Sequence, residues 1–282
     1  MDLILGTAQF GQIYGVTNKS KNHNNLKELE KIIQTLRDNG FKKIDTAKGY
    51  GNSESMLGEI GIDGFSVTSK VTFPTSIQKK RDQLIKDIED SISKLRLDSL
   101  DCLFAHNPDF LQNDPDGSYE LIDFLKKEGL IKRFGVSIYD PFIVPQKSFI
   151  DVIQFPSNIF DRRFIENEEF MNSCVEKQCR SVFLQGLLLE DYKKLPKFFE
   201  KYKDAFLKYD NYYPTFKEKL SSCIAFILNQ DFDEFLIGVS SNDELLDVIS
   251  CIKETLSKNI TVAKINFVKD NDNDLLDPRK WS

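Results

Sequence analysis

Residues 78–107, QKKRDQLIKDIEDSISKLRLDSLDCLFAHN, combine a helical pattern, a strand pattern and a polar end. Apolar residues recur at helical spacing from Leu84 to Leu95 with charged residues between them, which predicts an amphipathic helix over Gln78–Leu95. Ser99–Phe104 is short and largely apolar, as expected for a parallel strand that is covered on both faces. His106 follows directly, so this unit predicts an α/β fold with polar side chains at strand ends.

The same alternation extends in both directions. Strand patterns occur at Leu3–Leu5, Lys43–Asp45, Phe65–Ser69, Ser99–Phe104, Arg133–Ser137, Val152–Phe155, Ser181–Leu184 and Glu234–Val239. Helical patterns lie between them at Leu26–Asn39, Gln78–Leu95, Tyr119–Glu128, Asn167–Lys177, Thr215–Asn229 and Asp243–Lys258. Eight strands, each followed by a helix or a long connection, fit a (β/α)8 TIM barrel of ~250 residues. We therefore predict a single domain over residues 1–282, with a C-terminal tail at about 269–282.

A doubly wound open sheet is the competing architecture. That fold normally carries the pattern G-x-G-x-x-G between its first strand and the following helix. Here Gly6 and Gly11 have a different spacing, and the chain runs on to Tyr14 and Gly15 without a helical pattern. The first loop therefore disfavours the open sheet.

Composition and charge narrow the class of protein. Hydrophobic residues make up 40% and charged residues 29% of the chain, which is typical of a globular protein. The formal charge of −6 argues against binding nucleic acid or an acidic membrane through bulk charge. We see no signal peptide and no apolar run of the ~18 residues that a membrane span requires. The five scattered cysteines form no C-x-x-C pair, so we expect a cytoplasmic protein without a metal site.

Four residues at successive strand ends form a chemically sensible group: Asp45, Tyr50, Lys70 and His106. A buried lysine paired with a carboxylate is expected to lower the pKa of a neighbouring tyrosine from about 10. A neutral histidine can orient a carbonyl oxygen by hydrogen bonding. Together these residues offer the proton donor and the oxyanion pocket that reduction of a carbonyl requires.

These residues also carry a family resemblance. The stretch from Ile44 to Gly58, with Ser69-Lys70, Leu103–His106 and Gly135–Ser137, resembles the aldo-keto reductase family along nearly the whole chain. The resemblance implies a barrel that uses NADP or NAD, with Tyr50 as general acid and Lys70 and Asp45 as its tuning pair. His106 would then orient the carbonyl. The opening, the segment around Phe183 and the closing Asp277–Trp281 resemble a subgroup associated with bacterial surface-polysaccharide biosynthesis.

The resemblance also implies binding residues. Those matched to the cofactor are Thr7, Ser137, Gln154, Phe183, Gly238, Ser240, Ser241 and Asn242. A loop of Gly and Ser that opens a helix suits phosphate, because backbone N–H groups and the positive helix end face it. The remaining polar residues near strand ends are candidates for binding a sugar or nucleotide-sugar substrate: Gln9, Tyr14, Asn107, Asn158, Arg162 and Gln185.

Two departures from the family pattern concern the cofactor. Ile138 stands where the family usually has an Asn, and the last helix begins with Asp243 and Glu244 instead of basic residues. Acidic residues there would repel the 2′-phosphate of NADPH, so we expect a weakened preference for NADPH: either NADH is used as well, or cofactor binding is poor. Two other functions stay open: a non-redox epimerisation or elimination in the same barrel, and a catalytically silent binding protein.

Overall fold

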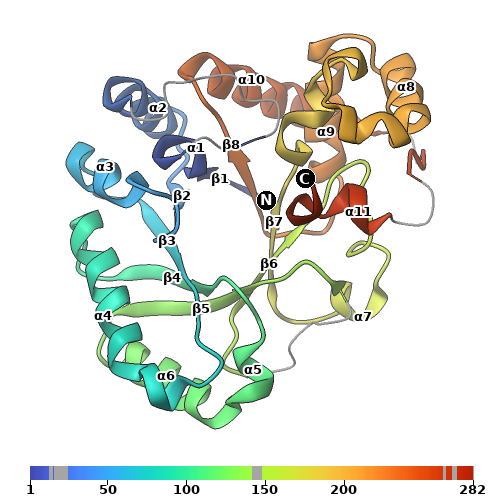
Figure 1. The fold of residues 1–282 in the computed structure, drawn as a ribbon. Helices are drawn as coiled ribbons and strands as arrows, with labels where there is room; N and C mark the ends of the chain where they lie inside the picture. The colour runs from blue at the N-terminus through green and yellow to red at the C-terminus, as the bar shows by residue number, and fades with distance from the viewer. Residues whose placement is uncertain (13–14, 16–24, 142–147, 263–264, 269–271, 282) are drawn as a thin grey trace.

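The computed structural model describes residues 1–12, 15, 25–141, 148–262, 265–268 and 272–281. Eight parallel strands close into a barrel in chain order, which confirms the predicted fold (Figure 1). The strands are β1 (Asp2–Gly6), β2 (Lys43–Asp45), β3 (Ser66–Val71), β4 (Leu100–Ala105), β5 (Ile131–Ser137), β6 (Val152–Pro156), β7 (Glu176–Arg180) and β8 (Glu234–Gly238).

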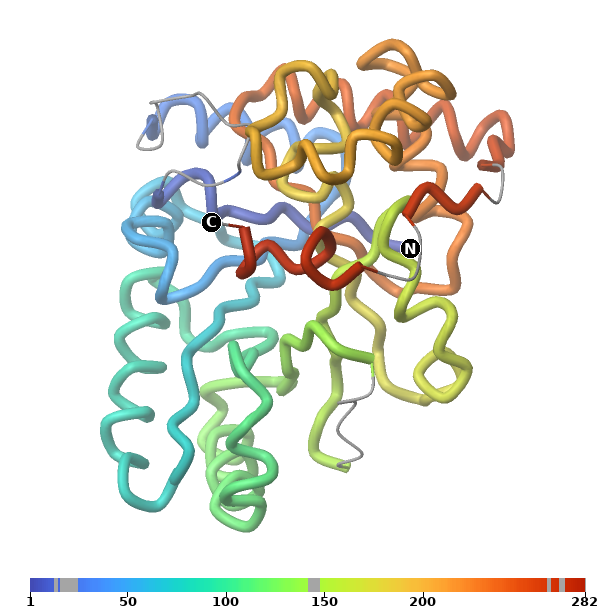
Figure 2. The backbone as a smooth tube through the Cα atoms, turned by 45° about the vertical axis from the view of Figure 1, so that its right-hand side comes forward, coloured from blue at the N-terminus to red at the C-terminus, as the bar shows by residue number. Residues whose placement is uncertain are grey.

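Helices surround this barrel (Figure 1). The longer ones are α2 (Leu26–Asp38), α3 (Ser53–Ile60), α4 (Ile77–Leu95), α6 (Pro115–Lys127), α8 (Lys203–Tyr212), α9 (Phe216–Leu228) and α10 (Asn242–Lys258). Single-turn helices are α1 (Ala8–Gly11), α5 (Phe110–Asn113), α7 (Glu168–Met171) and α11 (Asn273–Leu276). The tube in Figure 2 shows the C-terminal segment with α11 lying against the strand-end loops rather than extending away.

The seventh strand lies outside the predicted range. We expected it at Ser181–Leu184, after a helix over Asn167–Lys177, but the helix is only α7 and the strand is Glu176–Arg180. The run Val182–Leu184 is apolar because it packs into the core, and Leu184 lies in a 3-10 segment (Leu184–Leu189) that starts with positive φ. The observed strand has the sequence EKQCR, which is mostly polar, so a search for apolar runs does not detect it.

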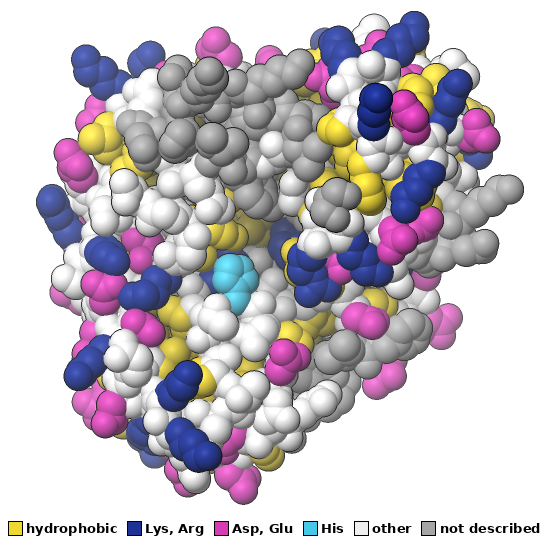
Figure 3. Space-filling view, in the orientation of Figure 1, with side chains coloured by type: hydrophobic (Ala, Val, Ile, Leu, Met, Phe, Trp, Pro, Cys, Tyr) yellow, Lys and Arg dark blue, Asp and Glu magenta, His cyan; other side chains and the backbone are white. Residues whose placement is uncertain are grey.

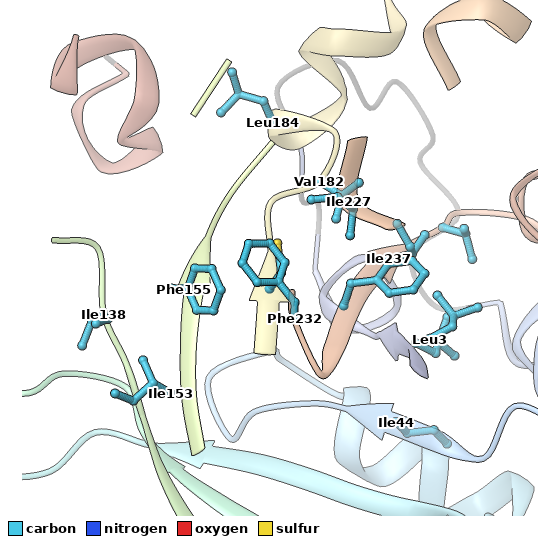
Figure 4. Close-up of a cluster of buried hydrophobic side chains, with 14 of the residues drawn as sticks. Leu3, Ile44, Ile138, Ile153, Phe155, Val182, Leu184, Ile227, Phe232 and Ile237 are labelled. Carbon is cyan, nitrogen blue, oxygen red and sulfur yellow. The ribbon is translucent and has the colours of Figure 1, made fainter. Parts of the chain in front are cut away.

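The hydrophobic core fills the space between the barrel and its helices. Figure 4 shows Phe155 of β6 and Phe232, whose rings meet edge to face with centroids 5.0 Å apart. Both residues are buried, as are Ile153 of β6 and Ile237 of β8. Burial of an aromatic side chain contributes roughly 1.5–3 kcal/mol. This apolar shell holds the strand ends, and with them the site, in place.

The interior of the barrel is polar along one line. Gln154, Gln178, Glu234 and Asp2 follow one another in register across β6, β7, β8 and β1. Gln178 accepts from Gln154 and donates to Glu234 Oε2 at 2.7 Å, and Glu234 pairs with Lys43. TIM barrels usually fill this space with branched apolar residues. Here a hydrogen-bonded chain connects the two ends of the barrel.

Candidate active site

The four predicted catalytic residues come together at the carboxyl ends of β2, β3 and β4. Lys70 and Asp45 are buried and form an ion pair, and Lys70 Nζ lies 5.5 Å from the centroid of the Tyr50 ring. The Tyr50 and His106 rings meet edge to face, with centroids 6.2 Å apart. The Asp45 carboxylate also accepts from Gln154 Nε2 at 3.0 Å. A buried ion pair needs such additional hydrogen bonds to be held in low-dielectric surroundings.

Close backbone contact places Tyr50. A Cβ atom on Gly11 would lie 1.6 Å from the Tyr50 carbonyl oxygen, so only glycine allows this approach. Gly51 has a φ of +55°, and a Cβ there would lie 2.0 Å from the Gly11 oxygen. Below this contact, Ser53 Oγ donates to Thr7 Oγ1 at 2.7 Å. The first loop and the β2 loop therefore form one rigid support for the tyrosine.

The electrostatics differ from our expectation for Tyr50. Burial raises the pKa of its hydroxyl, and the nearby Asp45 carboxylate raises it further, while Arg180 opposes this. We expected a lowered pKa from the neighbouring Lys70, but burial and the Asp45 carboxylate dominate and the net shift is upward. His106 behaves as expected: burial, followed by the charges of Lys70 and Arg180, lowers its pKa to about 4. At neutral pH the tyrosine is therefore protonated and the histidine is neutral.

A cavity of about 490 Å³ opens beside Tyr50 and extends over the ends of β6, β7 and β8 to the start of α10. Its size lies within the roughly 300–1,000 Å³ of small-molecule sites. In Figure 3 the His side chain is visible at this end of the molecule, with Lys and Arg side chains gathered to one side. The predicted site residues that line the cavity are Asp45, Tyr50, Thr7, Gln154, Phe183, Gly238, Ser240, Gln9 and Gln185.

Several predicted binding residues are engaged elsewhere. Asn107 exchanges hydrogen bonds with the Phe73 backbone, and Asn158 accepts from the N–H groups of Phe160 and Asp161. Both amides hold loops because their side chains replace backbone turns. The Arg162 guanidinium lies 5.3 Å from the Phe226 ring centroid. Ser137 is buried at the end of β5, in register with Gln154, and does not line the cavity. Tyr14 lies outside the described residues.

The start of α10 is occupied by carboxylates. Ser240 N donates to Glu244 Oε2 at 2.6 Å, and Asn242 N donates to Glu28 Oε1 at 2.7 Å. Ser241 caps the helix by accepting from Glu244 N, so Ser241 and Asn242 face the helix junction and not the cavity. The N–H groups that would hold a phosphate thus already bind acidic side chains, which favour this end of a helix.

Arg180 is among the lining residues that the sequence analysis missed. Arg180 ends β7 and lines the cavity beside Tyr50. A correct boundary for β7 would have revealed it, because it is the polar residue at that strand end. Its guanidinium lies 3.9 Å from the centroid of the Tyr139 ring, which follows β5.

The sequence matches the model of the Aldo/keto reductase family over residues 2–265. The chain belongs to the aldo/keto reductase family. It is therefore related to oxidoreductases. Among the described residues, no three metal-binding side chains are grouped, and no helix has the length and apolar character to cross a membrane.

Relatives within the family are distant. The chain is 28% identical over 177 residues to "Uncharacterized oxidoreductase YtbE" of Bacillus subtilis, covering 58% of this chain and 61% of that one. It is 24% identical over 140 residues to "6-dehydroglucose reductase" of Novosphingobium aromaticivorans, covering 44% and 46%. Both matches span less than two thirds of the relative. The aldo-keto reductase AKR11C1 from Bacillus halodurans (holo form) has the same fold, with a TM-score of 0.68 at 18% identity, covering 96% of this chain and 95% of that one.

Proposed function

We propose that this chain reduces a carbonyl group with a nicotinamide cofactor and uses Tyr50 as the proton donor. The observation that carries the proposal is the assembly of Tyr50, His106 and the Lys70–Asp45 pair beside the cavity. The reaction adds a hydride to the carbonyl carbon and a proton to the oxygen. A reduced nicotinamide supplies the hydride when bound.

Tyr50 is suited to deliver the proton. Its raised pKa keeps the hydroxyl protonated at neutral pH. When the proton leaves, the Lys70 ammonium, 5.5 Å from the ring centroid, stabilises the phenolate. Asp45 holds that ammonium in place, and Gln154 holds Asp45. The neutral imidazole of His106 donates a hydrogen bond to the carbonyl oxygen, which orients it toward Tyr50.

The cavity fits a nicotinamide at the end nearest Asp45. Gln154 Nε2 donates hydrogen bonds to Asp45 and Gln178, whereas its Oε1 accepts no hydrogen bond from the described residues. That oxygen suits the carboxamide of the cofactor. At the other end, Glu244 and Glu28 disfavour a 2′-phosphate by like-charge repulsion. We therefore propose that NADH binds at least as tightly as NADPH; a clearly tighter NADPH in equilibrium titrations would contradict this.

The substrate is proposed to be a sugar-like carbonyl compound. Gln9 lines the cavity, and its amide group can bind hydroxyls. The resemblance to a 6-dehydroglucose reductase supports this class. Tyr50→Phe tests the proposal: it should lower kcat/KM for aldehydes by about 10²- to 10⁴-fold with an unchanged unfolding midpoint. Tyr119→Phe, on the exposed face of α6, is the matched control. Retained turnover in Tyr50→Phe would refute the assignment.

A further inference from the structure

Arg180 is a cation that lines the cavity beside Tyr50. It is half-buried at the end of β7, where Nη2 donates to the Ile138 carbonyl at 3.1 Å and Nη1 to Ser181 Oγ at 3.2 Å. Its Nε is buried and has no hydrogen-bond partner among the described residues. The hydrogen bonds to Ile138 and Ser181 use one donor of each Nη group, so the guanidinium keeps further N–H donors for a group in the cavity.

Stacking fixes the guanidinium in position. Arg180 lies 3.9 Å and Arg279 3.8 Å from the centroid of the same Tyr139 ring. Two cations this close cannot share one face, so the ring lies between them. Tyr139 therefore anchors the C-terminal tail on one side and Arg180 on the other. A pre-positioned guanidinium loses little freedom when it binds a ligand.

Three cationic side chains of the described residues are paired with carboxylates, and Arg180 is not. Lys70 pairs with Asp45, Arg163 with Asp161, and Arg279 with Asp277. No carboxylate oxygen of the described residues lies within 4 Å of the Arg180 guanidinium. Asp161 is near enough to be affected by its charge, but Arg163 already binds both of its oxygens. The catalytic end of the cavity thus keeps an uncompensated positive charge.

We infer that Arg180 is an anion subsite that binds a carboxylate or phosphate group of the carbonyl substrate. The inference rests on the proposed function and names a class for its substrate: an aldehyde or ketone that carries an oxyanion. Guanidinium groups suit both anions because their planar N–H donors match paired oxygens. Arg180 lines the same cavity as Tyr50, the proposed proton donor, so an anionic group bound to it would lie in the cavity where the carbonyl is reduced.

The test compares two aldehydes of similar size, 4-carboxybenzaldehyde and its neutral methyl ester. Arg180→Met should lower kcat/KM for the carboxylate by about 10- to 100-fold and for the ester by less than about 3-fold. Arg180→Lys should recover part of the loss, because lysine keeps the positive charge but lacks the paired N–H donors of the guanidinium group. Calorimetric binding of 4-(hydroxymethyl)benzoate should weaken in parallel in Arg180→Met, which tests the subsite even if the protein reduces neither aldehyde.

Arg279→Met is the matched control, since it removes the other cation from the same ring but does not line the cavity. It should leave the preference for the carboxylate within about 3-fold. Equal losses for both aldehydes in Arg180→Met would indicate a purely structural role and overturn the inference. Weakened NADH binding with an unchanged carboxylate preference would assign the anion to the cofactor and overturn it as well.

Discussion

At the amino-terminal end of the barrel, Lys43 pairs with both Asp2 and Glu234, and Arg133 pairs with both Asp101 and Glu176. At the carboxyl-terminal end of the strands, which we call the mouth of the barrel, Lys70 pairs with Asp45. Arg180 at the same end has no ion-pair partner among the described residues. Each end also has a cavity, of about 580 Å³ at the first and 490 Å³ at the second.

This difference in ion pairing distinguishes charges that mainly stabilise the barrel from charges that are candidates for a role in binding or catalysis. At the amino-terminal end, Lys43 and Arg133 each form ion pairs with two carboxylates. At the mouth, the cavity is lined by the unpaired charge of Arg180 and by neutral polar side chains such as Gln9 and Gln185. Perturbed groups in a cleft are candidates for chemistry, whereas closed ion networks mainly stabilise. The Gln154–Gln178–Glu234 chain links the two regions.

The largest effect should come from breaking the buried pair at the mouth. Lys70→Met leaves the Asp45 carboxylate without its cation in a site where both side chains are about 1–2% exposed. The free energy of unfolding should fall by about 3–5 kcal/mol. Lys126→Met, in a pair that is 31% and 35% exposed, should cost less than about 1 kcal/mol. Urea denaturation measures both; similar losses in the two variants would contradict the contrast.

A smaller effect concerns pH at the mouth. The folded-state pKa of His106 is about 4, below its usual 6.5, so the unfolded chain binds the proton first as the pH falls. The stability contributed by the neutral ring is complete above about pH 6.5 and is lost between pH 6.5 and 4. His106→Asn should flatten this part of the stability curve. In the wild type, kcat/KM should decline with a midpoint near pH 4, and a midpoint near 6.5 would refute the neutral ring.

The smallest effect belongs to the opposite end. Burial and the charge of Glu234 raise the pKa of Glu176, although Arg133 opposes the shift. The folded chain therefore binds this proton more readily than the unfolded chain, and folding gains stability as the pH falls through that raised pKa. Glu176→Gln should change the unfolding free energy by less than about 1 kcal/mol at pH 7 and remove the gain in acid. A loss above 3 kcal/mol would show that the network depends on this charge.

Most of the fold follows from local sequence, and the exception is instructive. Seven strands lie at or near their predicted positions because they contain apolar residues that are buried in the folded chain. The sequence analysis missed β7 because the strand is rich in polar residues: Gln178 belongs to the hydrogen-bonded chain inside the barrel, and Glu176 pairs with Arg133. A local search for apolar runs cannot anticipate polar partners that only the closed barrel supplies. It selected Ser181–Leu184, in which Val182 and Leu184 are buried, but Leu184 begins a 3-10 segment and the run is not part of the sheet.

The sequence by itself predicted the barrel, seven of its eight strands, the family and the four residues that come together at Tyr50. Those features depend on local periodicity and on residue types at strand ends. Only the tertiary structure decided which amides reach the cavity, which carboxylates cover the start of α10, and that Arg180 lies beside Tyr50. The physical reason is that pairing and burial of a charge depend on neighbours from distant strands, and closure of the barrel determines those neighbours.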